Sequence, residues 1–170
     1  TLDHMLHHVE ATARGVKNAL LVGDMPIHSY DTVEQAVQSA KKLFLAGADA
    51  VKLEGGAAQA GNIRAIVEAG IPVVGHIGLL PQKVLEEGGY KIKGKSSAEE
   101  EALVRDVEAV AEAGACAVVV EGVTPHAARQ VTVHSSIPTL GIGSGSHTCD
   151  GDVVVIHDLV GAFPWFIPAF

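Results

Sequence analysis

The sequence predicts an α/β fold, a parallel (β/α) barrel, from two observations. Short apolar runs alternate with longer amphipathic segments along the 170 residues, as in parallel sheets whose strands are joined by crossover helices. The phrase AGADAVKLEGG, which starts at Ala46, returns as AGACAVVVEGV at Ala113, so a helix twice ends at a glycine and leads directly into a strand. A doubly wound open sheet shows a similar alternation of helices that end at glycine and strands, but no G-x-G-x-x-G fingerprint follows the first strand here.

Six apolar runs are expected to form the strands of this sheet. Each run is apolar throughout rather than alternating, which indicates burial on both faces of a parallel sheet. The expected strands are residues 18–24, 48–54, 71–76, 115–121, 137–143 and 153–158.

Amphipathic segments between these runs are expected to form the helices. Asp31 and Glu34 have the spacing of a capping box at the start of one helix, and Gly47 is suited to end it. Ser96 or Ser97 is expected to begin a later helix. The expected helices are the residues before Gly15 and residues 31–47, 60–70, 96–114 and 124–134.

Composition and charge limit the classes of function. With 48% hydrophobic residues and no low-complexity linker, residues 1–170 are expected to form a single domain. A net charge of −8 argues against a nucleic-acid or anionic-membrane surface. No apolar stretch approaches the ~20 residues that cross a bilayer, and no basic and hydrophobic signal begins the sequence. The expected location is the cytoplasm, with no nucleic-acid or membrane partner.

Polar side chains lie at or just beyond the carboxyl ends of four expected strands. They are Asp24, Glu54, His76 and Glu121, and Lys52 precedes Glu54 by two residues on the same strand. In a parallel barrel these strand ends share one rim, which holds the active site. Several carboxylates with a lysine and a histidine at one rim favour a hard cation, Mg²⁺ or Mn²⁺, over zinc.

Each of these residues also has a purely structural explanation. Asp24 could cap a turn, and His76 could be a loop histidine with satisfied hydrogen bonds. Lys52 and Glu54 lie on the same side of one strand and could simply pair. Glu121 is harder to explain in this way, because the run ACAVVVE places no cation beside it. A buried carboxylate without a partner favours its protonated form, which suits a general base near neutral pH.

Seven segments in order resemble the ketopantoate hydroxymethyltransferase (3-methyl-2-oxobutanoate hydroxymethyltransferase) family. They are VGDMP, AGADAVKLEGG, IPVVGHIGLLPQ, GGYKIKGK, VVVEGVTP, IPTLGIGSG and CDGDVVVIHDLVG. The resemblance implies a Mg²⁺-dependent (β/α)8 TIM barrel of the phosphoenolpyruvate/pyruvate superfamily. It also implies transfer of a one-carbon unit from 5,10-methylenetetrahydrofolate to 3-methyl-2-oxobutanoate, giving ketopantoate for pantothenate and coenzyme A synthesis. A homo-oligomer, a decamer in that family, is expected.

The resemblance also implies roles for particular residues. Asp24 matches a metal-binding aspartate that touches substrate, and Glu54 matches a glutamate of the metal site. Lys52 and His76 match residues that contact the keto acid, and Glu121 matches the proton acceptor. By position, the pocket is expected to be lined by Ile142, Val153 and Val155.

The sequence departs from the family pattern at both ends. The family barrel has eight strands and six are expected here, so the first two strands are absent, together with an Asp-Ser pair that follows the second and binds metal and substrate. The segment after the last strand, ending in WFIPAF, is shorter than the family's tail. Two further functions therefore stay open beside hydroxymethyl transfer. One is another Mg²⁺-dependent lyase or mutase of 2-oxo acids, and the other is an inactive fragment that binds metal or assembles with other subunits.

Overall fold

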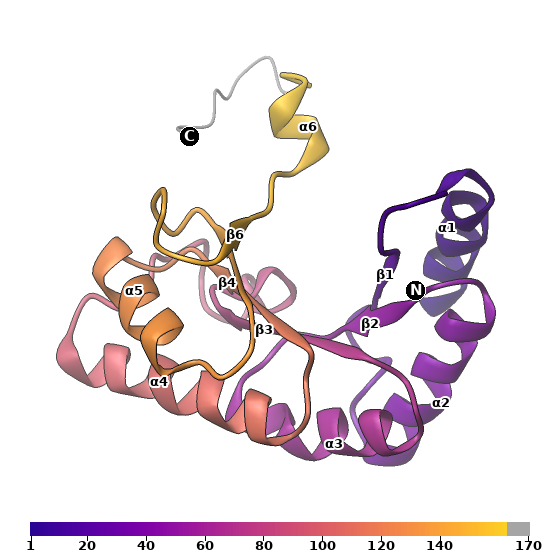
Figure 1. Cartoon of the computed structure of the whole chain (residues 1–170), viewed down its shortest axis with the longest axis horizontal. Helices are drawn as coiled ribbons and strands as arrows, with labels where there is room; N and C mark the ends of the chain where they lie inside the picture. The colour runs from indigo at the N-terminus through magenta and orange to yellow at the C-terminus, as the bar shows by residue number, and fades with distance from the viewer. Residues whose placement is uncertain (163–170) are drawn as a thin grey trace.

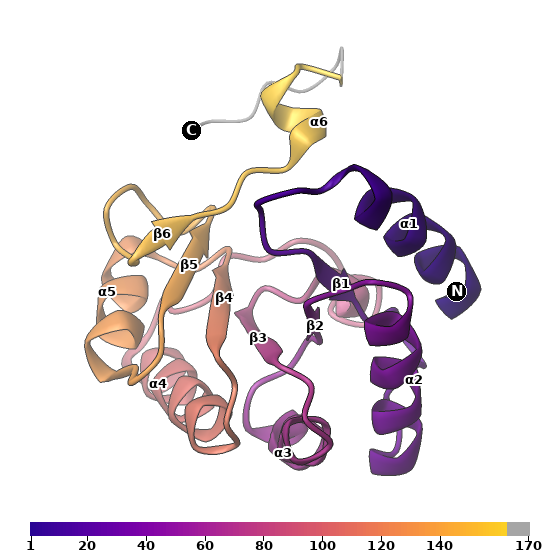
Figure 2. The same cartoon turned by 45° about the vertical axis from the view of Figure 1, so that its right-hand side comes forward.

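The computed structural model describes residues 1–162, which form a curled sheet of six parallel strands. The strands follow one another in sequence order, β1-β2-β3-β4-β5-β6, and every neighbouring pair is parallel. The sheet bends around part of a ring, with the helices that connect its strands on the outer side and the last helix apart from the sheet, beyond β6 (Figure 1, Figure 2). The prediction of an incomplete parallel barrel is confirmed. The tail segment at residues 165–170 lies outside the described residues.

Helices and strands alternate along the chain as the sequence predicts. The strands are Val22–Asp24 (β1), Ala50–Lys52 (β2), Val73–Gly78 (β3), Ala117–Glu121 (β4), Thr139–Ile142 (β5) and Gly151–Asp152 (β6). The helices are Leu2–Gly15 (α1), Val33–Leu45 (α2), Ala60–Glu68 (α3), Ser97–Glu112 (α4), Pro125–His134 (α5) and Ile156–Leu159 (α6), with 3₁₀ turns at Ala57–Gln59 (η1) and Pro81–Lys83 (η2). None of the described helices combines the length and the apolar character that spanning a membrane would require.

The prediction of a strand at residues 153–158 is wrong in its position. The sixth strand lies earlier, at Gly151–Asp152, and α6 occupies the second half of the predicted range. The Asp150 carboxylate accepts bonds from the backbone N and the Oγ1 of Thr139, at 2.8 and 3.0 Å, which aligns the start of β6 with β5. Val153 still donates its N–H to the Gly141 carbonyl over 2.8 Å, and Val153 and Val155 line a cavity. A sequence pattern does not show whether an apolar residue lies in a strand or in a cavity wall.

The cap of α2 lies one residue beyond the predicted one. Thr32 is the N-cap, and its side-chain oxygen accepts a bond from the backbone N of Gln35 at 3.2 Å. The Gln35 side chain returns a bond to the backbone N of Asp31 at 3.0 Å, so the expected pair of Asp31 and Glu34 is displaced by one position. At α4, Ser96 is the cap, which is one of the two expected residues.

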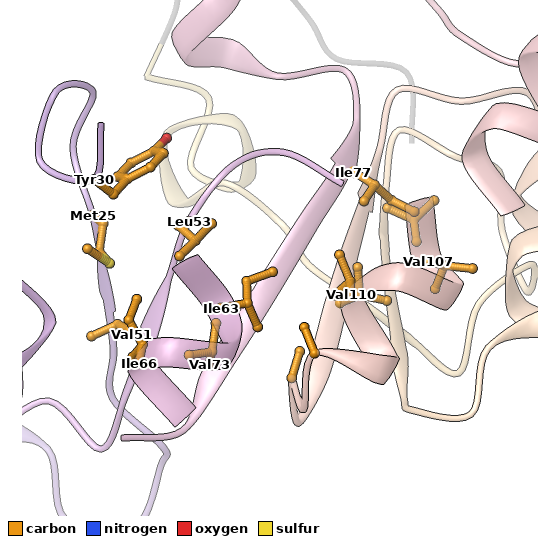
Figure 3. Packing of buried hydrophobic residues seen from close by; sticks show 14 of the residues in the cluster. Met25, Tyr30, Val51, Leu53, Ile63, Ile66, Val73, Ile77, Val107 and Val110 are labelled. Carbon is orange, nitrogen blue, oxygen red and sulfur yellow. The ribbon is translucent and has the colours of Figure 1, made fainter. Parts of the chain in front are cut away.

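An aliphatic core fills the space between the outer face of the sheet and the helices (Figure 3). Val51 and Val73 from the strands, with Ile66 and Val110 from the helices, are completely buried, and each contributes about 1.5–3 kcal/mol by leaving water. Gly75 allows α4 to approach β3 closely, because a Cβ at this position would lie 2.4 Å from Val110 Cγ1. Packing on the outer face leaves the inner, concave face for polar side chains.

Candidate active site

The inner face of the curled sheet carries a cavity of about 640 Å³. Its wall contains three carboxylates, one histidine and one lysine, and the majority of its side chains are aliphatic. All eight residues that the sequence nominates line this one cavity: Asp24, Lys52, Glu54, His76, Glu121, Ile142, Val153 and Val155. The structure thus brings together residues that are more than a hundred positions apart in the chain.

Strand register explains why the polar residues meet. Asp24 pairs with Lys52 across β1 and β2, so both side chains leave the sheet at the same level. His76 lies in β3, whose last residue pairs with Glu121 at the end of β4. Glu54 follows β2 by two residues, and the neighbouring Gly55 donates its N–H to the His76 carbonyl over 2.9 Å. Because parallel strands end at a common edge, each of these residues faces the cavity mouth.

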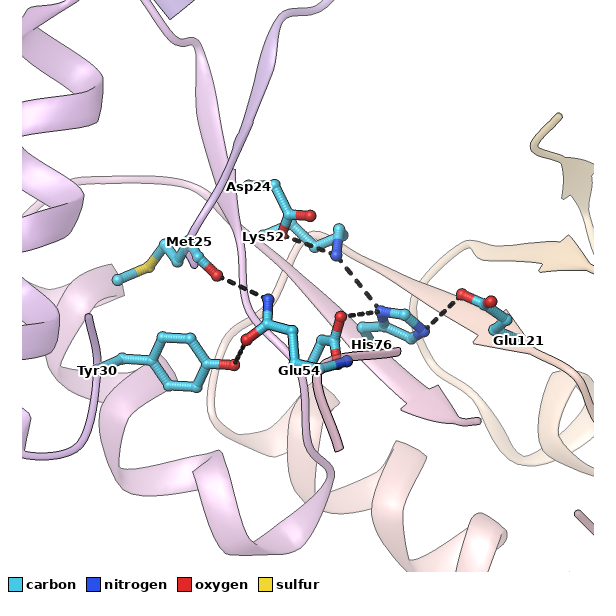
Figure 4. Close-up of polar contacts among 8 residues, drawn as sticks. Asp24, Met25, Tyr30, Lys52, Glu54, His76 and Glu121 are labelled. Carbon is cyan, nitrogen blue, oxygen red and sulfur yellow. Dashed lines mark hydrogen bonds and ion pairs between the residues drawn. The ribbon is translucent and has the colours of Figure 1, made fainter. Parts of the chain in front are cut away.

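The polar side chains form a connected cluster around His76 (Figure 4). Lys52 Nζ lies 2.8 Å from Asp24 Oδ1 and 3.4 Å from His76 Nδ1. The same His76 Nδ1 lies 3.8 Å from Glu54 Oε1, and Nε2 lies 3.2 Å from Glu121 Oε2. Since a lysine ammonium only donates, its contact with Nδ1 is a hydrogen bond only in the tautomer that carries the ring proton on Nε2, which faces Glu121.

The sequence-based inference that Glu121 has no partner is wrong. Its neighbours within β4 are all apolar, but His76 approaches from the adjacent strand β3. A single strand read alone does not show this contact, because the partner is supplied by strand pairing. Glu121 is therefore a carboxylate with an imidazole nitrogen 3.2 Å away, and its side chain is 23% exposed and lines the cavity.

Two buried atoms of the cluster lack a hydrogen-bond partner among the described residues. They are Asp24 Oδ1 and His76 Nε2, whose close contacts with Lys52 and Glu121 do not have hydrogen-bond angles. Buried polar atoms in proteins are nearly always satisfied, so these two atoms are candidates to bond to a water molecule or a ligand in the cavity. Asp24 Oδ1 offers an oxygen and His76 Nε2 offers a nitrogen to such a ligand.

Glu54 is the most deeply buried carboxylate of the cluster, with only 3% of the residue exposed. Burial raises the pKa of Glu54, and the negative charge of Asp24 adds to this. A bond from the backbone N of Gln82, 3.0 Å from Glu54 Oε2, and the charges of His76 and Lys52 lower the same pKa and only partly offset burial. The site therefore contains one carboxyl group that is easier to protonate than a carboxyl group in water.

Gln82 and Tyr30 belong to the site and were not nominated from the sequence. Gln82 bonds to Glu54 through its backbone N, and its side chain accepts a bond of 2.8 Å from the hydroxyl of Tyr30. Burial raises the pKa of Tyr30 to about 12, so this hydroxyl remains a donor at neutral pH. The segment IPVVGHIGLLPQ ends at Gln82 and was the available signal for this residue, whereas no motif marks Tyr30.

Asp24 and Glu54 provide carboxylate oxygens suited to Mg²⁺. No group of three or more His, Cys, Asp or Glu side chains within residues 1–162 is arranged to hold a metal ion. Mg²⁺ commonly uses only one or two protein carboxylates and completes its shell with water and substrate oxygens. The partly exposed carboxylate of Asp24 and the buried carboxylate of Glu54 fit that mode of binding.

The fold and this cluster define an α/β-barrel protein with an acidic site at the carboxyl ends of its strands. Solved structures share the fold. An oxaloacetate acetylhydrolase in complex with 3,3-difluorooxalacetate has a TM-score of 0.70 at 13% identity, covering 95% of this chain and 62% of that one. A 2,3-dimethylmalate lyase, a member of the PEP mutase/isocitrate lyase superfamily, has a TM-score of 0.60 at 21% identity, covering 82% and 50%.

Within that class, the chain belongs to the ketopantoate hydroxymethyltransferase family, whose sequence model matches residues 1–170. The 3-methyl-2-oxobutanoate hydroxymethyltransferase of Syntrophobacter fumaroxidans is 49% identical over 172 residues, covering 99% of this chain and 60% of the relative. The enzyme of the same name from Moorella thermoacetica is 49% identical, covering 100% of this chain and 64% of the relative. The chain thus spans less than two thirds of the length of these relatives.

Proposed function

We propose that this protein transfers a hydroxymethyl group from 5,10-methylenetetrahydrofolate to 3-methyl-2-oxobutanoate, giving 2-dehydropantoate (ketopantoate) for pantothenate and coenzyme A synthesis. The observation that carries the proposal is the meeting of Asp24, Lys52, Glu54, His76 and Glu121 in one cavity of a chain of this family. Each role below belongs to the proposal.

The cavity is divided in a way that suits a small branched 2-oxo acid. Lys52 and His76 present nitrogens on one side, where the carboxylate and keto oxygens would bind. Ile142, Val153 and Val155 present hydrocarbon on the other side, where the two methyl groups of 3-methyl-2-oxobutanoate would pack. A mostly apolar pocket with a few polar groups that fix orientation is the usual form of a small-molecule site.

Glu121 is the carboxylate best placed to accept the proton from C3 of the keto acid. Asp24 is engaged by the Lys52 ammonium at 2.8 Å, and Glu54 is held by the Gln82 N–H. Among residues 1–162, the charged or imidazole group that contacts Glu121 is His76 Nε2, and the Glu121 side chain remains partly open to the cavity. A general base needs access to the proton it removes and a partner that steadies its charge, and Glu121 has both.

Asp24 and Glu54 would hold Mg²⁺. When bound, Mg²⁺ supplies positive charge that polarises the keto group and stabilises the negative charge that develops on its oxygen. Lys52 would add a second positive charge beside those oxygens, and His76 would orient both Lys52 and Glu121. The aliphatic side chains of the wall would pack against the hydrocarbon part of the keto acid, beside the carbon that attacks the folate-borne methylene group.

The structural neighbours favour a second candidate, cleavage of a 2-oxo or 2-hydroxy acid carbon–carbon bond by a lyase. They include proteins named 2,3-dimethylmalate lyase and oxaloacetate acetylhydrolase. Their identities to this chain are 21% and 13%, against 49% for the hydroxymethyltransferases, so hydroxymethyl transfer is the preferred proposal. The homo-oligomer and the cytoplasmic location stay predictions of the family resemblance.

A turnover assay distinguishes these candidates. The protein is incubated with 3-methyl-2-oxobutanoate and 5,10-methylenetetrahydrofolate, with Mg²⁺ or with EDTA, and ketopantoate is measured by mass spectrometry. We expect product only with all three components, and a loss of product in Glu121→Gln but not in Glu101→Gln, whose exposed carboxylate lies on α4. Cleavage of 2,3-dimethylmalate or oxaloacetate without any hydroxymethyl transfer would replace the proposal by the lyase function.

A further inference from the structure

One residue, Gln82, bonds through its backbone and its side chain to the loops that follow two neighbouring strands and itself lies after a third. Gln82 lies in η2, shortly after β3, and its backbone N donates to Glu54 Oε2 beyond β2 over 3.0 Å. Its side-chain Nε2 donates to the carbonyl of Met25, directly after β1, also over 3.0 Å. Met25 is the chain neighbour of Asp24. Gln82 therefore touches one expected metal-binding carboxylate and the residue next to the other.

The orientation of the Gln82 amide is fixed at both ends. A carbonyl oxygen can only accept, so the carbonyl of Met25 must face the NH₂ group of the amide. The other end, Oε1, accepts the hydroxyl hydrogen of Tyr30 over 2.8 Å. Met25, Tyr30 and Glu54 lie around this amide (Figure 4). Met25 is completely buried and Tyr30 is 8% exposed, so neither partner is free to turn away.

We propose that Gln82 is a positioning residue, which sets Glu54 and Asp24 at a fixed separation so that both face one divalent cation and one 2-oxo acid. The inference rests on the proposed function, because it takes Asp24 and Glu54 as the metal-binding pair. Residues that orient metal ligands without touching the metal contribute strongly to affinity, and their loss typically costs 10–100-fold. Without the Gln82 amide, nothing else among the described contacts ties the loop after β1 to the loop after β3 at Met25.

Three variants isolate this role. Gln82→Met keeps the length of the side chain and the backbone N–H that holds Glu54 but removes both amide bonds. Tyr30→Phe keeps the ring and removes the hydroxyl, and with it the bond to Gln82 Oε1 and the interaction with the Glu54 backbone. Asn62→Leu is the matched control, because the Asn62 amide bonds to the Tyr30 carbonyl over 2.8 Å and supports the same loop without touching Glu54.

The readout is Mn²⁺ affinity without substrate, measured by the electron paramagnetic resonance signal of free Mn²⁺, beside the melting temperature and the kcat and KM for 3-methyl-2-oxobutanoate. We expect Gln82→Met to weaken Mn²⁺ binding about tenfold or more and to lower kcat/KM in parallel. Tyr30→Phe should show a smaller loss in the same direction. Asn62→Leu should lower the melting temperature while leaving the Mn²⁺ affinity unchanged.

Two results would overturn the inference: wild-type Mn²⁺ affinity in Gln82→Met, or an equal loss of affinity in Asn62→Leu at an equal loss of thermal stability. The proposed function fails separately. If the wild type binds Mn²⁺ and shows the expected variant pattern but transfers no hydroxymethyl group, the positioning role stands and the assigned reaction does not. If the wild type does not bind Mn²⁺ at all, both are rejected.

Discussion

Replacing Gly78 by alanine is predicted to destabilise the protein and to displace the proposed base. Gly78 ends β3 with φ of +94°, and a Cβ on it would lie 2.3 Å from the carbonyl oxygen of Glu121. Gly70 is a matched control, because it has φ of +82° but no atom within 4 Å of its Cβ position. Comparing the two alanine variants separates the cost of the left-handed backbone from the cost of the steric clash.

The magnitudes follow from these two environments. A left-handed backbone costs an L-residue about 1–2 kcal/mol, which is the whole expected loss for Gly70→Ala. Gly78→Ala adds the cost of forcing atoms into a packed site, about 1–3 kcal/mol, which gives about 2–5 kcal/mol in total. The atom in contact belongs to the backbone of β4 and not to a flexible side chain, so relief requires the strand that carries Glu121 to move.

Urea denaturation of both variants measures these losses, provided that the slope m is unchanged. Exchange of the C3 proton of 3-methyl-2-oxobutanoate then reports whether Glu121 has moved. We expect wild-type exchange in Gly70→Ala and a strong reduction in Gly78→Ala. Equal destabilisation of the two variants, or full exchange activity in Gly78→Ala, would refute the reasoning that β3 and β4 meet tightly at this point.

Three other predictions concern charge and capping. The pKa of Glu54 is raised by burial, so ionisation of this carboxyl group opposes folding. In EDTA, the melting temperature of Glu54→Gln should therefore exceed that of wild type by a margin that is absent at pH 4 and grows as the pH rises towards 8. A margin independent of pH would contradict this. Burial raises the pKa of Tyr30 to about 12, so absorbance at 295 nm should show a transition near pH 12 that Tyr30→Phe lacks. The free energy of unfolding of the wild type should fall between pH 10 and 12. A single absorbance transition unaffected by the substitution would argue against burial of this hydroxyl. Thr32→Ala should lower the free energy of unfolding by about 1 kcal/mol and Asp31→Ala by clearly less, since Thr32 is the observed cap; the reverse order, measured by urea denaturation, would restore Asp31 as the cap.

The meeting of the site residues could be predicted from sequence because it follows from topology. Asp24 and Glu121 each end a strand and His76 lies two residues before the end of β3, and parallel strands joined by helices end at one edge. Their nomination needed only the strand boundaries, which were close to those observed. A pair between Lys52 and Glu54 was left open as a structural alternative, but Lys52 contacts Asp24 and His76, and only strand register decides between such partners.

The contacts made by loops could not be predicted in this way. Gln82 bonds to Glu54 and Met25, which are 28 and 57 positions away, and no local pattern encodes such distances. The sixth strand was misplaced for a different reason, because Val153 and Val155 are apolar as part of the cavity wall. Hydrophobic patterning reports that a residue avoids water, but it does not report whether the neighbour is a strand, a helix or a ligand.

The most direct test of the central claim is the exchange of the C3 proton of 3-methyl-2-oxobutanoate for deuterium in D₂O, followed by proton NMR with Mg²⁺ and without folate. The roles proposed here predict exchange by the wild type and none by Glu121→Gln, while the variant still binds the keto acid. Exchange at the wild-type rate in Glu121→Gln would contradict the assignment of Glu121 as the base.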